Sequence, residues 1–346
     1  MSETSTRSGQ LRHSPAGAAT PAGGENQPGR RKRRGMRIAL ISVGSVFALV
    51  AVIAVAGLVT FNHIASEIKR VPVHFAKLTA YDHYAGLSAP GGTNVLLTSS
   101  VRQPAVRGGS DLITILHINA NHQAGGVVAI SPNVVVAVPG HGRLPLGEAQ
   151  AVGGPSLLVS AVQEVTGVRL SHYASLDFSH VANVVNTAGG VNVTLPAATT
   201  AGRYTFHAGV NHLNGAQVLA YTSRPGLSSE DHVLRQQVVL RAILRKIANA
   251  HLLTNPVGTV DMLSALTAML TVDSNFTNSE LASLASELKG LSSGSGTFLT
   301  APVRNSQGQE VLNTRISDKM WTAVNKGTLA AFAKQFPSTV TPAEVP

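Results

Sequence analysis

The amino-acid sequence predicts a mixed α/β domain that follows a single transmembrane helix. From about residue 94, short apolar runs rich in Val and Ile alternate with segments of helical periodicity, a pattern typical of mixed α/β proteins. Nearer the N-terminus, the 24 residues 38–61 carry no charge, and roughly 20 apolar residues suffice to cross a bilayer as a helix. Hydrophobic residues make up 44% of the 346-residue chain, which is enough to fill the core of one large domain.

Residues 1–37 are predicted to form a disordered, basic tail, because they are rich in Gly, Pro, Ser and polar residues and cannot bury a core. They hold eight Lys or Arg and two Glu, and therefore +6 of the chain's formal net charge of +10. Residues 30–34 form a basic cluster just before the apolar run, which places the tail in the cytoplasm and everything after residue 62 outside. The same cluster suits anionic lipid headgroups.

The apolar run is interpreted as an uncleaved, single-pass anchor. A cleaved signal peptide is the alternative, but its apolar region is shorter, about 7–15 residues, and the following NHIASEIKRV has no clear small-residue cleavage pattern. The predicted organisation is a cytoplasmic tail at 1–37, a transmembrane helix at 38–61, a linker and lead-in at 62–91, an extracytoplasmic domain at 92–336 and a C-terminal tail at 337–346.

The expected elements of the domain follow in order. NVLLTS, DLITILHI, GGVVAIS and NVVVAVPG are predicted strands, and residues 153–168 a helix that ends at Gly167. Another helix is expected within HYASLDFSHVANVVNTA, and a strand over residues 189–195. The turn LNG then leads through an apolar run and a polar loop to a helix that opens at Arg235. Its buried face is expected to contain four apolar residues: Val233, Leu240, Leu244 and Ile247. Two helices over residues 255–290, a strand at GTFLTAPV and a terminal helix at MWTAVNKGTLAAFAKQF complete the prediction.

Several functional classes are excluded by composition and spacing. The chain has no Cys, so disulfides, thiolate zinc sites and a cysteine nucleophile are unavailable. Outside the tail the net charge is about +4 and no nucleic-acid-binding motif occurs, which argues against a nucleic-acid partner. The histidine pairs His117 with His122 and His207 with His212 are five residues apart, which suits no zinc site, and surface positions are expected for them.

Catalytic motifs of other enzyme classes are also missing from the sequence. Neither a Gly-X-Ser-X-Gly elbow nor a phosphate-binding GK[ST] loop occurs, and GHGRLPLG is predicted to be a turn. In HYASLDF, Tyr173 and Asp177 are expected to pack and to cap.

Seven segments together resemble one known family. NVLLTSSVR, GSDLITILHI, AISPNVVVAVPG, HYASLDF, AGGVNVTLP, LNGAQVLAY and RQQVVLRAIL occur in the order and spacing of the LytR-CpsA-Psr family. The resemblance covers residues 94–253 with clear motifs and extends more loosely to about residue 336. It implies a bacterial cell-membrane protein whose three-layer α/β/α extracytoplasmic domain holds a polyprenyl-phosphate lipid in an apolar cavity. Members transfer glycopolymers from a polyprenyl-pyrophosphate carrier to peptidoglycan, generally with Mg²⁺.

Such a phosphotransferase needs arginines and a carboxylate-held metal around the pyrophosphate, and most of the family's polar positions are changed in this chain. Asp111 remains of an Arg-X-Asp-Thr motif, without its arginine. The family's other polar positions fall on the following residues: Ser100 for an acidic residue; Ser131, Pro132 and Asn133 for Pro-Arg-Asp; Pro145 and Gly147 for Lys and Asn; Ser223 and Pro225 for paired arginines; Ser229 and His232 for Asp and Arg.

Five residues remain as candidates for the site. Arg235 and Gln236 match the family's Arg-Gln pair at the lipid phosphate, and helix N-termini attract anions; a solvated helix arginine and a buried, backbone-bonded glutamine are the alternatives. Asp111 is either a weak Mg²⁺ ligand or a carboxylate bonded to backbone N–H groups. Arg102 and Arg224 either make up lost charge or are surface arginines.

Two functions follow from these readings. The chain is either a transferase that joins an envelope glycopolymer to peptidoglycan, with Asp111 and Arg235 as catalytic residues, or a divergent paralogue that binds polyprenyl phosphate or wall polymer without turnover. Whether it is an enzyme stays open on the sequence.

Overall fold

The computed structural model describes most of the chain beyond the apolar run. The described residues are 62–75, 92–100, 110–120, 125–223, 226, 229–249, 256–290 and 296–342. The predicted tail and the predicted transmembrane segment at 38–61 lie outside these ranges. Within them, no helix combines the length and apolar character needed to cross a bilayer. All described elements belong to the compact unit Leu58–Pro346.

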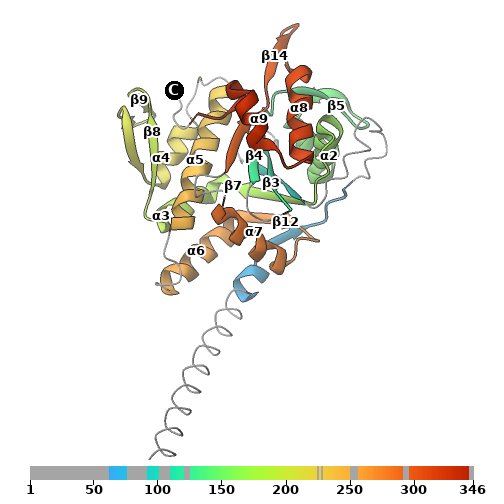
Figure 1. Ribbon diagram of the computed structural model, residues 1–346. Helices are drawn as coiled ribbons and strands as arrows, with labels where there is room; N and C mark the ends of the chain where they lie inside the picture. Colours follow the sequence, from blue (N-terminus) through green and yellow to red (C-terminus); the bar gives the residue numbers. More distant parts are fainter. Residues whose placement is uncertain are drawn as a thin grey trace, which may run out of the picture. The chain divides into compact units, whose positions relative to one another are not determined.

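A seven-stranded mixed sheet forms the centre of this unit (Figure 1). Its order is β1-β12-β7-β2-β3-β4-β13. The strands are β1 (Lys69–Val71), β2 (Thr93–Ser100), β3 (Ser110–Ile118), β4 (Gly125–Ile130), β7 (His172–Asp177), β12 (Leu270–Asp273) and β13 (Thr297–Thr300). β2 is parallel to β7 and antiparallel to β3, β3 is antiparallel to β4, and β13 is parallel to β4. The mixed α/β prediction is confirmed.

Helices cover both faces of the sheet. One face is covered by α2 (Glu148–Thr166), α8 (Thr314–Asn325) and α9 (Leu329–Gln335). On the other face lie α3 (Val181–Thr187), α4 (Gly215–Thr222), α5 (Ser229–Asn249), α6 (Pro256–Met269) and α7 (Asn278–Gly290). Two short 3-10 helices are η1 (Phe178–His180) and η4 (Pro337–Thr339), and residues 62–66 are also helical. Alternation along β3 supplies both sides: Ile113 and Ile115 pack under α2, and Leu112 packs on the opposite face.

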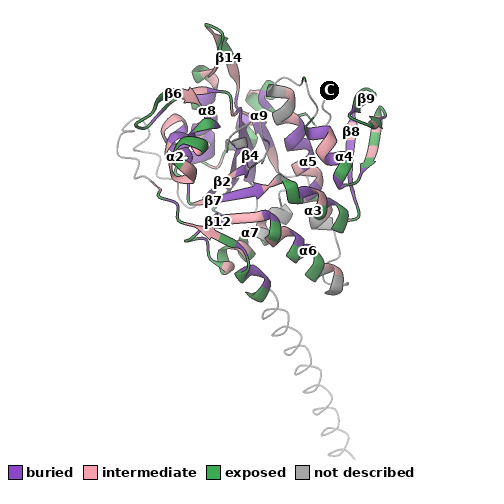
Figure 2. Cartoon of the chain, turned by 180° about the vertical axis from the view of Figure 1, so that it is seen from behind, coloured by how far each residue is buried: buried purple, intermediate pink, exposed green. Residues whose placement is uncertain are grey.

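Four two-stranded ladders project from these layers. They are β5 (Val135–Val138) with β6 (Gly142–Pro145), β8 (Val191–Leu195) with β11 (Gly209–Leu213), β9 (Thr199–Ala201) with β10 (Tyr204–Phe206), and β14 (Val303–Ser306) with β15 (Gln309–Leu312). Figure 2 shows the central strands as buried and the β9 region as largely exposed. The predicted turn at GHGRLPLG lies in the β5–β6 hairpin, where Gly140 and Gly142 have φ of 72° and 69°.

The helix predicted at 153–168 starts earlier, at Glu148, and is broken in its first half. Gly153 and Gly154 have non-helical backbone angles, and Gly154 has φ 69° and ψ −168°, a region open essentially to glycine alone. Pro155 then begins the second segment, as proline does at a first helical position. The predicted end is confirmed, because Gly167 adopts the left-handed conformation with φ 63° and its N–H bonds the Gln163 carbonyl.

The remaining differences from the sequence prediction concern breaks and short strands. The terminal helix is two helices, α8 and α9, separated by a turn at Gly327 with φ 65°. Strand β12 lies between the two helices expected at 255–290 and pairs with β1, in the stretch assigned to the lead-in. Strands of three or four residues give too short a pattern to identify in a sequence.

The last described residues join the sheet at its β13 edge. Val340 forms an isolated antiparallel bridge with Leu299, and the Thr341 N–H donates to the Phe298 carbonyl at 2.9 Å. The sequence assigns residues 337–346 to a tail, but the structure packs Thr341, 2% exposed, against β13 and α5. This segment covers part of an edge strand that would otherwise expose its backbone groups.

Candidate functional site

Four of the seven segments that carry the family-like motifs meet at one edge of the sheet. β2, β4 and β7 run in the same direction and end there, and β3, antiparallel to β2 and β4, begins there. Ligands of open α/β sheets bind outside the carboxyl ends of strands. We call this side the carboxyl edge. It brings together Ser100 at the end of β2, the start of β3 with Asp111, and Ser131 after β4.

The turn after β4 shows that two of the changed motif positions are neighbours in space. Gly147 donates its N–H to the Pro132 carbonyl at 2.8 Å, and Leu146 donates to the Val134 carbonyl at 2.9 Å. Asn133 is exposed. Pro132 and Gly147, which stand where the family has polar side chains, therefore lie next to each other in this turn.

A carboxylate enters this turn from a part of the chain that the motifs do not cover. The Ser131 hydroxyl, on a residue 4% exposed, donates to Oε2 of Glu310 at 3.0 Å, and Glu310 lies on β15. Sequence reasoning missed Glu310, because 179 residues separate it from Ser131 and no motif surrounds it. A lone Glu in a short strand carries no signal of its own.

Arg235 is buried, and its position corrects two expectations. α5 begins at Ser229, so Arg235 lies in the second turn of the helix and its backbone is not part of the helix N-terminus. The residue is 1% exposed, which overturns the solvated alternative. Its Nη1 donates to the Tyr221 carbonyl at 3.2 Å, and its guanidinium carbon lies 4.5 Å from the centre of the Tyr221 ring. The cation therefore sits over an aromatic face and at the C-terminal carbonyls of α4.

Tyr221 completes this arrangement on the α4 side. Its ring meets Phe206 edge to face at 5.8 Å, and it is fully buried. Burial raises the pKa of the Tyr221 hydroxyl, and the nearby Arg235 opposes that shift. Within the described part of the chain the hydroxyl oxygen has no hydrogen-bond partner. The Tyr221 hydroxyl and the Arg235 guanidinium therefore form a buried polar pair within an otherwise apolar layer.

The two glutamines after Arg235 differ from each other. Gln236, the predicted phosphate contact, is 3% exposed. Gln237 is fully buried; its Nε2 donates to the Leu299 carbonyl at 3.0 Å and its Oε1 accepts from the Thr341 hydroxyl. Gln237 therefore ties α5 to β13 and to the C-terminal segment, a role that the sequence did not indicate. The buried residues of the helix are also shifted: Val238, Val239 and Ile243 are buried, whereas Leu240 and Leu244 are half-buried.

The other predicted site residues are placed only in part. Asp111 is the second residue of β3, and Ile113 pairs with Ile130, so the backbone of Asp111 runs beside the turn after β4. Its side chain lies outside the described atoms, as do Arg102 and Arg224 entirely. Asp177 caps η1, since its Oδ1 accepts from the Ser179 N–H at 3.0 Å, which confirms the capping prediction.

Among the described residues, no group of three or more His, Asp or Glu side chains is arranged so that it could hold a metal ion. His117 is 2% exposed, which corrects the surface expectation. Its two ring nitrogens lie 2.7 Å and 2.9 Å from the side-chain oxygens of Asn94 and Asn119. Burial lowers the pKa of His117, and the Asn119 bond opposes the shift. This histidine is a satisfied core residue at the opposite edge of the sheet.

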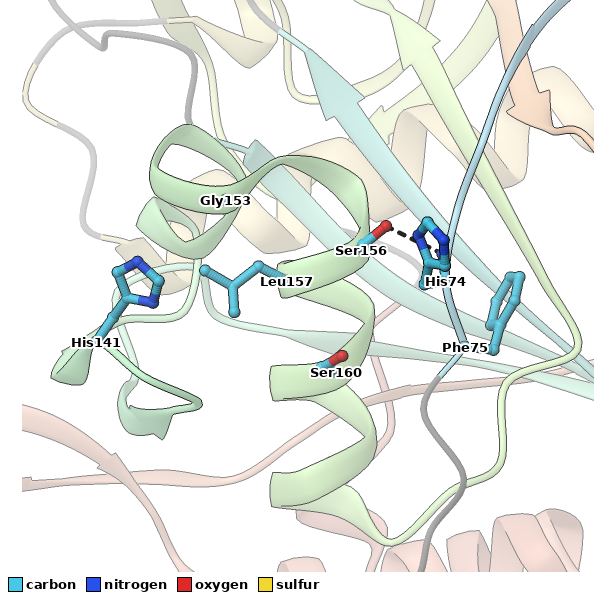
Figure 3. Close-up of a pocket in the computed structure, with 7 residues that line it drawn as sticks. All are labelled: His74, Phe75, His141, Gly153, Ser156, Leu157 and Ser160. Carbon is cyan, nitrogen blue, oxygen red and sulfur yellow. Dashed lines mark hydrogen bonds between the residues drawn. The ribbon is translucent and has the colours of Figure 1, made fainter.

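A cavity of about 400 Å³ lies around the break in α2 (Figure 3). Its lining includes His74, Phe75, His141, Ser156 and Leu157. The His74 N–H donates to the Ser156 hydroxyl at 3.0 Å, as the dashed line in Figure 3 shows. None of its lining residues is a predicted site residue.

Comparison with known proteins identifies the family. The model of the LytR_cpsA_psr family matches residues 58–326, well over half of the chain. The chain belongs to this family. LcpB of Corynebacterium glutamicum, named a probable cell wall biosynthesis protein, is 32% identical over 187 residues, which cover 53% of this chain and 45% of LcpB.

A second curated relative carries a named activity. TagU of Oceanobacillus iheyensis, named a polyisoprenyl-teichoic acid–peptidoglycan teichoic acid transferase, is 28% identical over 182 residues, which cover 49% of this chain and 56% of TagU. The matched stretch thus spans about half the length of these relatives. The LytR-Csp2A-Psr enzyme from Actinomyces oris superposes with a TM-score of 0.59 at 19% identity, covering 80% of this chain and 99% of that one. This likeness shows a LytR_cpsA_psr fold.

Proposed function

We propose that this chain is a membrane-anchored member of the LytR_cpsA_psr family that transfers a glycopolymer from a polyprenyl-pyrophosphate carrier to peptidoglycan. The name of the Oceanobacillus relative, a transferase acting between a polyisoprenyl carrier and peptidoglycan, supports this class of reaction. The competing proposal is a paralogue that binds polyprenyl phosphate or wall polymer without turnover, which the replaced charges at Ser131, Pro132 and Asn133 support.

The observation that carries the proposal is the buried guanidinium of Arg235. A guanidinium is a strong donor to phosphate oxygens, and its charged hydrogen bonds are strengthened in a low-dielectric layer such as the one that holds Arg235, 1% exposed. The Tyr221 ring and carbonyl fix the position of the guanidinium, so it is held ready for a lipid phosphate that enters the same layer. The polyprenyl chain would then lie among the apolar residues between the sheet and α3, α5 and α6.

Phosphoryl transfer also requires charge to be neutralised on the phosphate oxygens. Mg²⁺ usually binds through one or two carboxylates together with substrate phosphates. The backbone of Asp111 runs beside the turn after β4, and a single carboxylate ligand at this edge fits an ion held mainly by the substrate. We assign the protein ligand to Asp111. Arg102 and Arg224 are proposed to add positive charge near the same phosphates.

The anchor and the location complete the proposal. The uncharged run 38–61 is proposed to cross the bacterial cell membrane once, with the basic cluster at 30–34 inside and the α/β/α domain outside. An outward-facing domain on a short tether would meet both a lipid carrier in the membrane and the wall.

Lipid binding tests the role of Arg235. Purified full-length chain is titrated with a long-chain polyprenyl monophosphate and with the matched polyprenol, and binding is followed by native mass spectrometry. Arg235→Ala removes a charged hydrogen bond, so phosphate affinity should fall roughly 10- to 150-fold, or about 1.5–3 kcal/mol, with little change for the alcohol.

Arg203→Ala is the matched control for this experiment. Arg203 also lies over a tyrosine ring, 5.1 Å from the centre of Tyr204, but it is exposed. Its variant should bind both lipids as the wild type does. A wild-type chain that takes up neither lipid would refute the transferase and a paralogue that binds polyprenyl phosphate.

Turnover separates the two proposals. A Mg²⁺-dependent transfer rate that Asp111→Ala abolishes supports the transferase. Each lost charge contact commonly costs about 100-fold in rate, so turnover is expected to be well below that of a family member with intact motifs. Lipid binding without any transfer supports the binding-only paralogue.

A further inference from the structure

The carboxylate of Glu310 is delivered to the carboxyl edge by a projecting hairpin. β14 and β15 rise from this edge directly after β13 (Figure 1). Their turn places Gln307 and Gly308 at φ 54° and 77°, the conformation of a tight two-residue hairpin turn, and the Gly308 N–H donates to Asn305 Oδ1 at 3.0 Å. Glu310 pairs with Asn305 across the ladder, close to the turn.

One oxygen of this carboxylate is held and the other is not. The buried Ser131 hydroxyl bonds Oε2 at 3.0 Å, which fixes the direction of the side chain. Neither a hydrogen bond to Oε1 nor an ion pair to Glu310 occurs among the described residues. Glu310 is half-exposed, so Oε1 is within reach of a ligand approaching from solvent.

Glu310 lies at the same edge of the sheet as the start of β3, which carries the proposed metal ligand Asp111. Ser131 follows β4, whose partner strand β3 begins beside it with Asp111. α5, which carries Arg235, packs on β3 and β4. A carboxylate near a pyrophosphate repels it electrostatically. Such a carboxylate therefore needs a function there, either as a metal ligand or as the group that takes the proton of the attacking hydroxyl. Because Glu310 comes from a projecting hairpin and is half-exposed, an acceptor hydroxyl can reach it from solvent.

We propose that Glu310 orients and deprotonates the acceptor hydroxyl in the transfer reaction, which rests on the proposed transferase function. The acceptor oxygen forms a bond to the glycopolymer-linked phosphorus and passes its proton to Oε1 of Glu310. The bond from that phosphorus to the bridging oxygen breaks, and its electron pair leaves on the polyprenyl phosphate. Ser131 is a positioning residue that holds Oε2 and so presents Oε1.

Three variants and one control test this assignment in the full-length chain. Glu310→Gln keeps an acceptor oxygen for Ser131 but cannot take a proton, whereas Glu310→Asp keeps the carboxylate and withdraws it by one methylene. Ser131→Ala frees the carboxylate from its tether. Asp318→Asn, at an exposed position on α8, removes the same charge elsewhere.

The assay follows transfer from a polyprenyl-pyrophosphate disaccharide to a soluble peptidoglycan oligosaccharide, with polyprenyl monophosphate binding measured in parallel. Glu310→Gln should lower kcat about 100-fold or more at unchanged lipid affinity. Glu310→Asp should recover part of that loss, Ser131→Ala should lower kcat by a smaller factor than Glu310→Gln, and Asp318→Asn should match the wild type.

The results that overturn the inference differ from those that overturn the function. Wild-type transfer by Glu310→Gln would refute the role of Glu310 and leave the transferase intact. If Glu310→Gln lowers the transfer rate and the remaining rate no longer depends on Mg²⁺, Glu310 is a metal ligand, and its role as a proton acceptor is refuted. A wild-type chain that binds lipid and transfers nothing would overturn both the transferase and the role of Glu310.

Discussion

Replacing Gln237 with Ala should loosen α5 from the sheet and weaken lipid-phosphate binding together. Gln237 is fully buried and lies two residues after Arg235 on the same helix. Its amide bonds the Leu299 carbonyl at 3.0 Å and the Thr341 hydroxyl, and the Thr300 hydroxyl lies 3.5 Å from its Oε1. The side chain therefore connects α5, β13 and the C-terminal segment at one point.

The magnitude follows from the groups that lose a partner. Alanine would leave the Leu299 carbonyl and the Thr341 hydroxyl without the amide, and each buried unpaired polar group costs about 1–3 kcal/mol. The free energy of unfolding should therefore fall by about 2–6 kcal/mol, which in a domain of this size corresponds to a fall in Tm of roughly 5–20 °C. A shift of Arg235 by even a fraction of an ångström would also weaken the phosphate contact proposed for it.

Thermal unfolding of the full-length chain, followed by circular dichroism with and without polyprenyl monophosphate, measures both effects. Gln335→Ala, at an exposed glutamine that ends α9, is the control and should change Tm by no more than about 1 °C. Thr341→Val should be destabilising as well, and the double variant should lose less than the sum, because both changes remove the same bond. A Gln237→Ala chain with wild-type Tm and affinity would refute the view that this contact sets the position of α5.

Three further predictions concern a buried carboxylate, a helix break and the topology. Burial acts to raise the pKa of Asp273, but the bonds from His172 and from the Tyr173 and Asn275 N–H groups together hold it below its usual value. The stability this adds is present above the unfolded pKa of about 3.9 and is lost as the pH falls through the folded pKa, so the destabilisation of Asp273→Asn in urea should shrink below about pH 4. Gly154→Ala should cost about 1–3 kcal/mol in the same assay, since φ 69° with ψ −168° suits only glycine; a neutral effect would contradict the observed break. In intact spheroplasts, protease should spare a tag at the N-terminus and remove one placed after Pro346, and the reverse pattern would contradict the predicted orientation.

Motif order and local pattern were enough to predict the family and the main elements. The Gly167 helix end, the strands β2 to β5 and the mixed sheet follow from hydrophobic periodicity and glycine chemistry, which act over a few residues. The sequence predicts the start of α5 six residues late, because the polar stretch before Arg235 is typical of a loop, whereas in the structure it begins the helix. Strands β1 and β12 were missed, since each is stabilised by its partner and not by its own sequence.

The candidate site, like the fold, was predicted only in part from the sequence. The sequence by itself determined which motif positions lost their charge and that Asp111 and Arg235 kept theirs, because these residues lie within motifs whose spacing is read along the chain. Only the tertiary structure decided that Arg235 is buried over Tyr221, that Gln237 binds Leu299 and Thr341, and that Glu310 meets Ser131. Each of these contacts joins residues 14 to 179 positions apart, and such pairs are set by the packing of helices and strands against each other, for which a local pattern holds no information.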